Sequence, residues 1–125
     1  MLRAFLLVGI GGFFGSIARY GIGLALNKYF TKPFPVATLA VNLIGCFLIG
    51  LLFGIAQRNS ELQSNWWLVL ATGFCGGFTT FSAFALENNN LLADKHSMSA
   101  IGYTRFSVVF GIFLCKLGMI LTAQS

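Results

Sequence analysis

Long apolar runs alternate with short polar breaks and divide the chain into four segments, about residues 2–26, 34–57, 65–87 and 98–122. The second segment contains no charged residue, and the third contains none before its final position. Each is long enough for a transmembrane helix, which needs about 20 mostly apolar residues. Helices pair the backbone polar groups that hydrocarbon leaves without water. The pattern predicts an all-α membrane protein, with residues 1–125 as a single integral membrane domain.

The composition agrees with this prediction. Hydrophobic residues make up 57% of the chain and charged residues only 9%, whereas soluble domains carry about 25% charged residues. So few polar residues cannot coat a soluble core. A net charge of +5 would favour nucleic acid in a soluble protein. Here the basic residues flank or interrupt apolar segments, so no nucleic-acid partner is expected.

Positive charges show almost no preference for one side of the predicted bundle. Arg3 and Arg58 fall on one side, and Lys28, Lys32 and Lys95 fall on the other. Because lysine and arginine set the orientation of membrane helices, this balance leaves two interpretations open. Either the chain inserts in one weakly favoured orientation, or it inserts both ways up and pairs antiparallel.

Three glycine pairs at spacing i, i+4 place small residues on one helix face. They are Gly11 and Gly15, Gly50 and Gly54, and Gly73 and Gly77. Membrane helices use such faces to approach one another closely. Packing within one chain would account for the pairs, and oligomerisation is the alternative. We expect at least a dimer.

The third segment carries glycines and adjacent threonines at its centre, in the run GFCGGFTTFSAF at positions 73–84. Such residues weaken the helical ladder, so we predict a third helix that is broken mid-span. A break frees carbonyl oxygens, which membrane depth tolerates only where they are buried or face a cavity or ion. Those oxygens suit an alkali cation. The alternative is a kinked helix repaired by hydroxyl groups.

Several side chains inside the segments could line an anion path. Phe81 and Phe84 share one helix face, and aromatic rings have a positive edge that can face an anion. The amide of Asn42, one turn after Thr38, carries two N–H donors. Lipid-facing or core packing is the alternative for the phenylalanines, and interhelical hydrogen bonding is the alternative for Asn42.

The remaining polar residues of the spans extend this picture. Tyr103 and Ser107, at spacing i, i+4, could form a row of hydroxyl donors. Arg19 and Glu87 are charges within or near the membrane, where charges are usually functional. Snorkelling to the headgroups is the alternative for Arg19, and it is the expected behaviour of the fourth-segment cations, Arg105 and Lys116.

The sequence contains no catalytic constellation, so an enzyme is not expected. The single histidine, His96, lies in a loop without a second histidine or a carboxylate cluster. The three cysteines, Cys46, Cys75 and Cys115, are odd in number and lack metal-ligand spacing. The glycines of the third segment lack the Gly-Lys-Ser/Thr of a phosphate-binding loop.

Three motifs together resemble the CrcB/Fluc family of fluoride channels. They are G-x-x-G-S-x-x-R-Y at 12–20, T-x-x-V-N-x-x-G at 38–45 and GFCGGFTTFSAF at 73–84. The resemblance runs through all four segments. It implies a dual-topology, antiparallel homodimer with two pores, which lets fluoride leave a bacterial cytoplasm. The expected location is the bacterial inner membrane, as a multi-pass protein.

The resemblance also implies roles for particular residues. Pore residues would be Phe81, Phe84, Asn42, Tyr103, Ser107, Thr80 and Ser82. The backbone carbonyls of Gly76 and Thr79 would bind a structural Na⁺ at the dimer interface, and Arg19, Thr38 and Glu87 would line or support a vestibule. The family often has a further hydroxyl one turn after Ser107, where this chain has Gly111.

Two rival functions fit less well. A small multidrug exporter also has four short helices, but it needs a carboxylate in its first helix, and residues 2–26 contain none. A non-transporting subunit of a membrane complex would leave the polar residues inside three spans unexplained. Fluoride efflux from liposomes would separate these functions.

Overall fold

The computed structural model describes residues 1–30, 35–59 and 63–123. Its elements are α1 (Leu2–Asn27), α2 (Val36–Arg58), α3 (Asn65–Trp67), the π-helical η2 (Leu68–Cys75), α4 (Gly76–Phe78), α5 (Phe81–Ala93) and α6 (Ser97–Ala123). Four stretches are long and apolar enough to cross a membrane: α1, α2, the combined stretch Asn65–Ala93, and α6. The prediction of an all-α chain with four helices able to span a membrane is confirmed.

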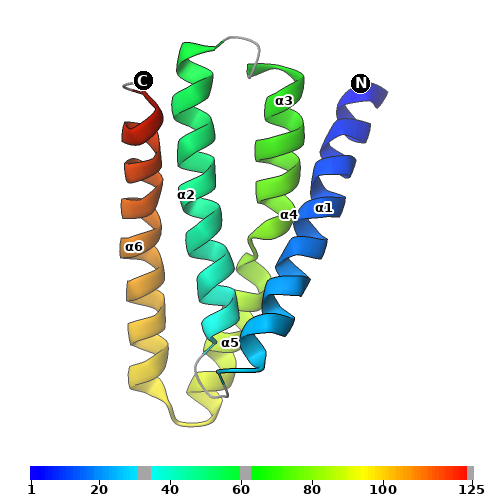
Figure 1. Ribbon diagram of the computed structural model, residues 1–125. Helices are drawn as coiled ribbons and strands as arrows, with labels where there is room; N and C mark the ends of the chain where they lie inside the picture. Colours follow the sequence, from blue (N-terminus) through cyan, green and yellow to red (C-terminus); the bar gives the residue numbers. More distant parts are fainter. Residues whose placement is uncertain (31–34, 60–62, 124–125) are drawn as a thin grey trace.

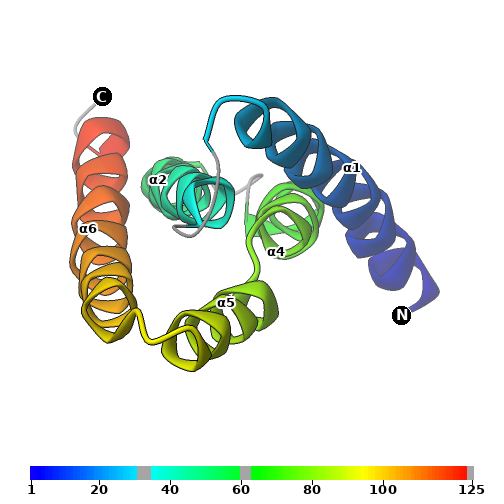
Figure 2. The ribbon, with the colours of Figure 1, turned by 90° about the horizontal axis from the view of Figure 1, so that it is seen from below.

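Two closely packed helix pairs build the chain. Figure 1 shows α2 beside α6, and α1 beside η2 and α4. In Figure 2, α2 lies between α6 and α4, with α1 on the far side of α4. Both termini lie at one end of the molecule, as four consecutive crossings require. At the opposite end, a short connection joins α5 to α6.

Glycines bring α1 and the third span into backbone contact. A Cβ atom added at Gly11 or Gly15 would overlap the backbone of the η2 stretch, including that of Phe74. On the facing helix, a Cβ at Gly73 or Gly77 would lie 2.7 or 2.8 Å from a carbonyl oxygen of α1. Real Cβ atoms essentially never approach so closely, so both glycine pairs are used within one chain.

The contact between α2 and α6 depends on glycine in the same way. A Cβ at Gly50 would overlap the backbone of Cys115, and one at Gly54 would overlap the last turn of α6. From the α6 side, a Cβ at Gly118 would lie 2.6 Å from the carbonyl oxygen of Phe47. All three glycine pairs therefore act within the chain, and the glycine pattern by itself does not indicate a second copy.

The helix bounds agree with the sequence expectation within about two residues, except at the end of the third span. We predicted an end at residue 87, but α5 continues to Ala93. The polar residues there remain helical because Asn88 and Asn89 donate side-chain hydrogen bonds to carbonyls one turn earlier, each at 3.2 Å. The predicted start of the second segment at residue 34 lies outside the described residues, as does Lys32.

The end of α5 is set by a left-handed residue. Lys95 has φ 64°, and its N–H donates to the carbonyl of Leu92 at 3.1 Å. The N–H of His96 donates to the carbonyl of Leu91 at 2.7 Å. This pair of hydrogen bonds is a Schellman motif, which closes a helix by satisfying its last carbonyls.

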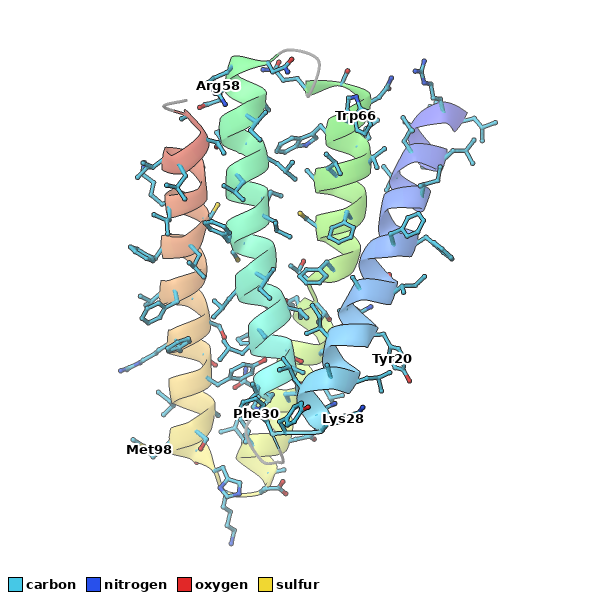
Figure 3. The ribbon with its side chains drawn as sticks, in the orientation of Figure 1. Tyr20, Lys28, Phe30, Arg58, Trp66 and Met98 are labelled. Atoms are coloured by element: carbon cyan, nitrogen blue, oxygen red, sulfur yellow. The ribbon has the colours of Figure 1, made fainter. Side chains whose placement is uncertain are left out.

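The two ends of the bundle carry residues typical of membrane interfaces. In Figure 3, Arg58 and Trp66 lie at one end, and Lys28, Phe30 and Met98 lie at the other. Aromatic and basic residues favour the headgroup region on both sides of a bilayer. The apolar side chains exposed between these ends, on α1 and α6 above all, are suited to contact with lipid.

The buried core lies where α5 and α6 meet beside α2. Leu91, Ala100 and Tyr103 form a buried cluster, with Leu39 and Phe84 packed against it. Tyr103 is fully buried. This core fixes the lower half of the third span against the other helices and so positions the site described next.

Candidate functional site

The helix of the third span is interrupted between α4 and α5. Thr79 (φ −89°, ψ 160°) and Thr80 (φ −149°, ψ 119°) are extended. The side chain of Asn42 on α2 takes the place of the missing helical partners. Its Oδ1 accepts the Thr80 N–H at 2.8 Å, and its Nδ2 donates to the Thr80 carbonyl at 3.1 Å. Asn42 therefore makes the interhelical hydrogen bonds that we gave as an alternative, and one of its two amide hydrogens is used.

Side chains satisfy other backbone groups at the interruption. The Thr80 hydroxyl accepts the Ala83 N–H at 3.1 Å and so caps α5. The Thr79 hydroxyl donates to the Cys75 carbonyl at 2.9 Å. From α1, the Arg19 Nε donates to the Gly77 carbonyl at 3.0 Å. Arg19 thus links α1 to the interruption instead of extending freely to the headgroups.

Some carbonyl oxygens at the interruption accept no hydrogen bond in the described structure. Among the residues that the structure describes, no hydrogen bond reaches the carbonyl of Gly76 or of Thr79. Gly76 is exposed, and a Cβ atom added there would meet nothing within 4 Å. Both residues line the cavity described next. A carbonyl pair of this kind fits a hard cation from the standpoint of ligand chemistry.

A cavity of about 460 Å³, here called the central groove, collects most of the predicted pore residues. It is lined by Asn42, Gly45, Cys46, Ile49, Ala71, Thr72, Cys75, Gly76, Thr79, Thr80, Phe81, Phe84, Ser107 and Val108. These residues come from α2, the third span and α6. The groove therefore brings together segments far apart in the sequence at the point where the third span is interrupted.

The phenylalanines of the groove differ in burial. Phe81 is 79% exposed, whereas Phe84 packs between Phe81 and Tyr103. The ring centroids lie 5.7 Å apart for Phe81 and Phe84, and 4.9 Å apart for Phe84 and Tyr103. Phe84 is therefore held by the core, and Phe81 presents its ring to the open side of the groove.

Ser107 is the unusual polar residue of the groove. Its Oγ is buried and has no hydrogen-bond partner in the described structure. One turn later, a Cβ atom at Gly111 would lie 3.3 Å from the Sγ of Cys46, so a further hydroxyl there would crowd that thiol. The hydroxyl of Ser107 is thus a donor without a protein acceptor.

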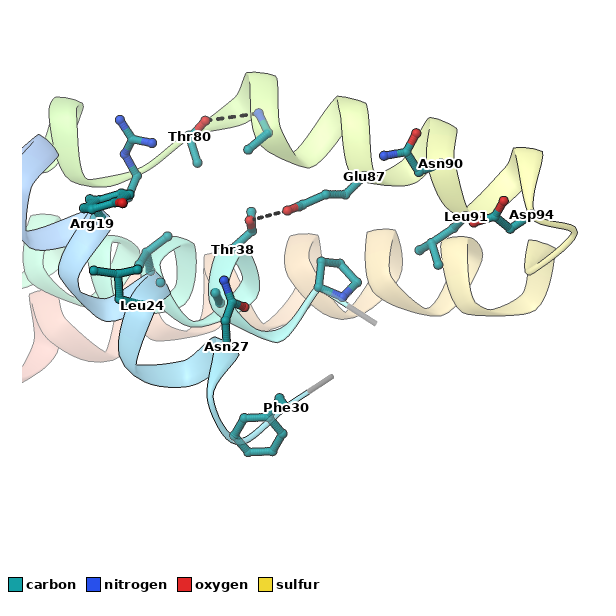
Figure 4. A pocket seen from close by; sticks show the side chains of 16 residues that line it. Arg19, Leu24, Asn27, Phe30, Thr38, Thr80, Glu87, Asn90, Leu91 and Asp94 are labelled. Atoms are coloured by element: carbon teal, nitrogen blue, oxygen red, sulfur yellow. Dashed lines mark hydrogen bonds between the residues drawn. The ribbon is translucent and has the colours of Figure 1, made fainter. Parts of the chain in front are cut away.

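A second cavity of about 430 Å³, here called the polar cavity, lies between α1, α2 and α5 (Figure 4). Arg19, Asn27, Thr38, Thr80, Glu87, Asn90 and Asp94 contribute polar groups to its lining. Thr80 lines both cavities. The two cavities therefore adjoin at the interruption of the third span.

Glu87 is the centre of a hydrogen-bonded group at the edge of the polar cavity. Its Oε2 accepts from the Thr38 hydroxyl at 2.7 Å, as Figure 4 shows, and its Oε1 accepts from the Tyr103 hydroxyl at 3.0 Å. Through these two hydrogen bonds the Glu87 carboxylate on α5 links α2 and α6. The Tyr103 hydroxyl proton is used here, so Tyr103 and Ser107 do not form a continuous row of free donors.

Ser82 lies outside both cavities, although it contacts Thr80. Ser82 is exposed and lines neither cavity, and its Oγ lies 3.2 Å from the Thr80 hydroxyl. Sequence reasoning missed Thr72, which lines the groove one turn before Gly76. The sequence feature that could have identified Thr72 is its hydroxyl, four residues before Gly76 and so on the same helix face. Sequence reasoning also gave no role to Gly45, where a Cβ atom would overlap the Thr79 side chain.

The described residues form no disulfide and no cluster of metal-binding side chains. All three cysteines are free thiols. The described residues contain no group of three or more His, Cys, Asp or Glu side chains that could hold a metal ion.

The fold defines a small multi-pass membrane protein, with two cavities between its helices that share Thr80. The model of the CrcB-like protein, camphor resistance (CrcB) family matches residues 6–119. The chain therefore belongs to the CrcB-like family, and the resemblance noted in its motifs is confirmed.

Similar proteins cover nearly the whole chain. The protein named fluoride-specific ion channel FluC from Prosthecochloris aestuarii is 49% identical over 118 residues, which are 94% of this chain and 91% of that protein. The protein of the same name from Azobacteroides pseudotrichonymphae is 41% identical over 98% of each chain. That from Flavobacterium psychrophilum is 37% identical over 98% of this chain and 99% of its own.

Proposed function

We propose that this protein is a fluoride-selective ion channel, not an enzyme, that lets fluoride leave the cytoplasm and so lowers its toxicity. The names of the relatives support this function. The observation that carries it is the central groove, where the Ser107 hydroxyl, buried and without a described partner, shares the lining with Asn42 and with the rings of Phe81 and Phe84. The proposed location is the inner membrane of a bacterium, since the relatives are bacterial proteins.

The groove supplies groups that can replace the hydration shell of a small anion. Asn42 keeps one amide hydrogen, and the Ser107 hydroxyl has no described acceptor. The N–H groups of Phe81 and Ser82, in the first turn of α5, donate to no described residue. A helix N-terminus favours negative charge. The rings of Phe81 and Phe84 add positive edges while excluding water.

The two adjoining cavities suggest a route for the ion. The anion would enter the polar cavity beside Arg19, whose charge attracts anions, and pass Thr80 into the central groove. Thr38 and Glu87 support the entrance by fixing α2 to α5. The depth of the helix interruption near mid-membrane is part of this proposal. Selectivity against chloride would come from a narrow, rigid passage.

A second copy of the chain would complete the pore. Thr72, Gly76 and Phe81 are exposed in one chain, although polar and backbone groups are costly to expose to lipid. A partner covering the groove would remove this cost. We propose an antiparallel homodimer with dual topology, because the positive charges favour neither orientation.

A structural Na⁺ would fit at this interface. The Gly76 and Thr79 carbonyls accept no hydrogen bond from any described residue, and both residues line the central groove. Two carbonyl oxygens from each copy would give the ion four hard ligands. When bound, the ion would supply fixed positive charge between the copies, and the chain's part is to hold these carbonyls outward.

The decisive experiment is efflux from liposomes that contain only the purified protein. A fluoride electrode should record rapid fluoride release, and a chloride electrode should record little chloride release under the same gradient. The rival exporter predicts proton-coupled movement of organic cations. Equal release of both halides, or none, would contradict the proposed function.

A further inference from the structure

Two cations inside α6 have no role in the proposed channel. Arg105 and Lys116 are both exposed, and neither lines the central groove or the polar cavity. Neither forms an ion pair or hydrogen bond with any residue that the structure describes. The exposed residues around them on α6 are apolar, among them Val109, Ile112 and Phe113. A charge in such surroundings requires a partner outside the chain.

Helix geometry places both cations on one outer face. They are 11 residues apart, which at 100° per residue returns to within about 20° of the same direction. The buried residues of α6, including Tyr103, Gly111 and Gly118, lie on the opposite side. The face of Arg105 and Lys116 therefore points away from the rest of the chain.

Their depth places the two cations in opposite leaflets. The middle of α6 falls at Phe110, so Arg105 and Lys116 lie about 8 and 9 Å from it, in opposite directions. Hydrocarbon extends about 15 Å from the bilayer centre. Each side chain must extend toward the headgroups of its own leaflet to keep its charge solvated.

The two positions are not equivalent. The Cα–Cβ bond of a helical residue leans toward the helix N-terminus. Arg105 therefore leans toward its own headgroup region, whereas Lys116 leans toward the bilayer centre and must fold back. A guanidinium also binds phosphate through two hydrogen bonds, whereas an ammonium acts as a point charge.

We propose that the outer face of α6 binds anionic phospholipid at two places, one in each leaflet, through Arg105 and Lys116. A lipid is the occupant that the charges favour. Of the three acidic residues in the sequence, only Glu87 lies within a span, and it is held by Thr38 and Tyr103. A second copy of the chain thus offers no free carboxylate at this depth, whereas a lipid phosphate is negative and near the headgroup level.

The test uses the purified protein with equimolar phosphatidylglycerol and phosphatidylcholine, and native mass spectrometry to count the lipids retained. The wild type should prefer phosphatidylglycerol. Arg105→Gln should lower this preference about fivefold, which corresponds to about 1 kcal/mol for one cation near the membrane surface. Lys116→Gln should have a smaller effect, and the double variant should lose more of the preference than either single variant. Lys28→Gln, an equal charge change beyond the end of α1, measures what a cation outside the α6 face contributes, and the double variant should lose clearly more than it does.

Three results would overturn the proposal. The wild type could show no preference, or the double variant could keep the full preference. Alternatively, the double variant could change the oligomeric state in gel filtration, which would mean that this face contacts another protein chain. Because the readout is bound lipid, the result does not depend on fluoride transport.

Discussion

Replacing Phe81 with leucine tests whether this residue lines the anion path or only fills space. Phe81 is 79% exposed. Full burial of a phenylalanine contributes about 3 kcal/mol at most, so the buried fifth of this side chain contributes roughly 0.5 kcal/mol. Leucine keeps part of that, and beneath the partner that we propose over the groove it is a near-volume-conserving replacement, which usually costs less than about 1.5 kcal/mol. We therefore expect Phe81→Leu to fold and assemble almost as well as the wild type.

The expected effect on transport is much larger. If the ring edge faces the anion in a water-free site, its loss should resemble the loss of a desolvated cation–π contact, about 2 kcal/mol. At about 1.4 kcal/mol for each factor of ten, efflux should slow about thirtyfold. Phe84→Leu should slow efflux at least as much, because Phe84 also packs against Tyr103.

The assay is fluoride efflux from liposomes, with gel filtration to confirm that each variant assembles like the wild type. Phe13→Leu is the matched control, because Phe13 is 61% exposed and lines neither cavity. Phe53→Leu is a second control from α2. Wild-type efflux from both Phe81→Leu and Phe84→Leu would mean that the anion path lies elsewhere. An equal loss in the controls would make the effect nonspecific.

Five further predictions concern Asn42, the glycine contacts, Thr79, sodium and the topology. Asn42→Asp should abolish efflux without preventing assembly, since it replaces an amide donor with a charge that repels the anion. Gly50→Ala should lower thermal stability by about 1–3 kcal/mol, because its Cβ would overlap the α6 backbone, whereas Gly9→Ala meets nothing and should not. Thr79→Ser should transport normally, since the backbone carbonyl and the hydroxyl bond to the Cys75 carbonyl persist. Replacing sodium with N-methylglucamine should weaken the dimer in gel filtration. Tags on the termini should be accessible from both sides of the membrane in intact cells.

The following results would contradict four of these predictions. Normal efflux from Asn42→Asp would remove the amide from the proposed path. Equal melting of the two glycine variants would contradict the close packing of α2 and α6. A dimer indifferent to sodium would leave the Gly76 and Thr79 carbonyls without the proposed ion, and tags accessible from one side only would exclude dual topology.

The four spans and the family were determined by the sequence. A run of about 20 apolar residues has few structural options besides a membrane helix, because hydrocarbon offers no other partner for the backbone. The glycines and threonines of 73–84 also identified the segment where α4 ends and α5 begins. These are local properties, so no knowledge of the other helices was needed.

The partners of each side chain were decided only by the tertiary structure. Asn42 bonds to Thr80, the Tyr103 proton goes to Glu87, and Ser107 keeps no described partner. The sequence could not choose among these outcomes, because residues 16 or 38 positions apart on different helices meet only when the helices pack.

The physical reason lies in the solvent. A soluble helix shows its inner face as an apolar stripe, but a membrane helix is apolar on both its lipid-facing and its protein-facing sides. The sequence therefore located the spans without showing which face of each turns inward. That choice is visible at glycines such as Gly11, Gly50 and Gly118, where the neighbouring helix backbone lies closer than a Cβ atom would allow.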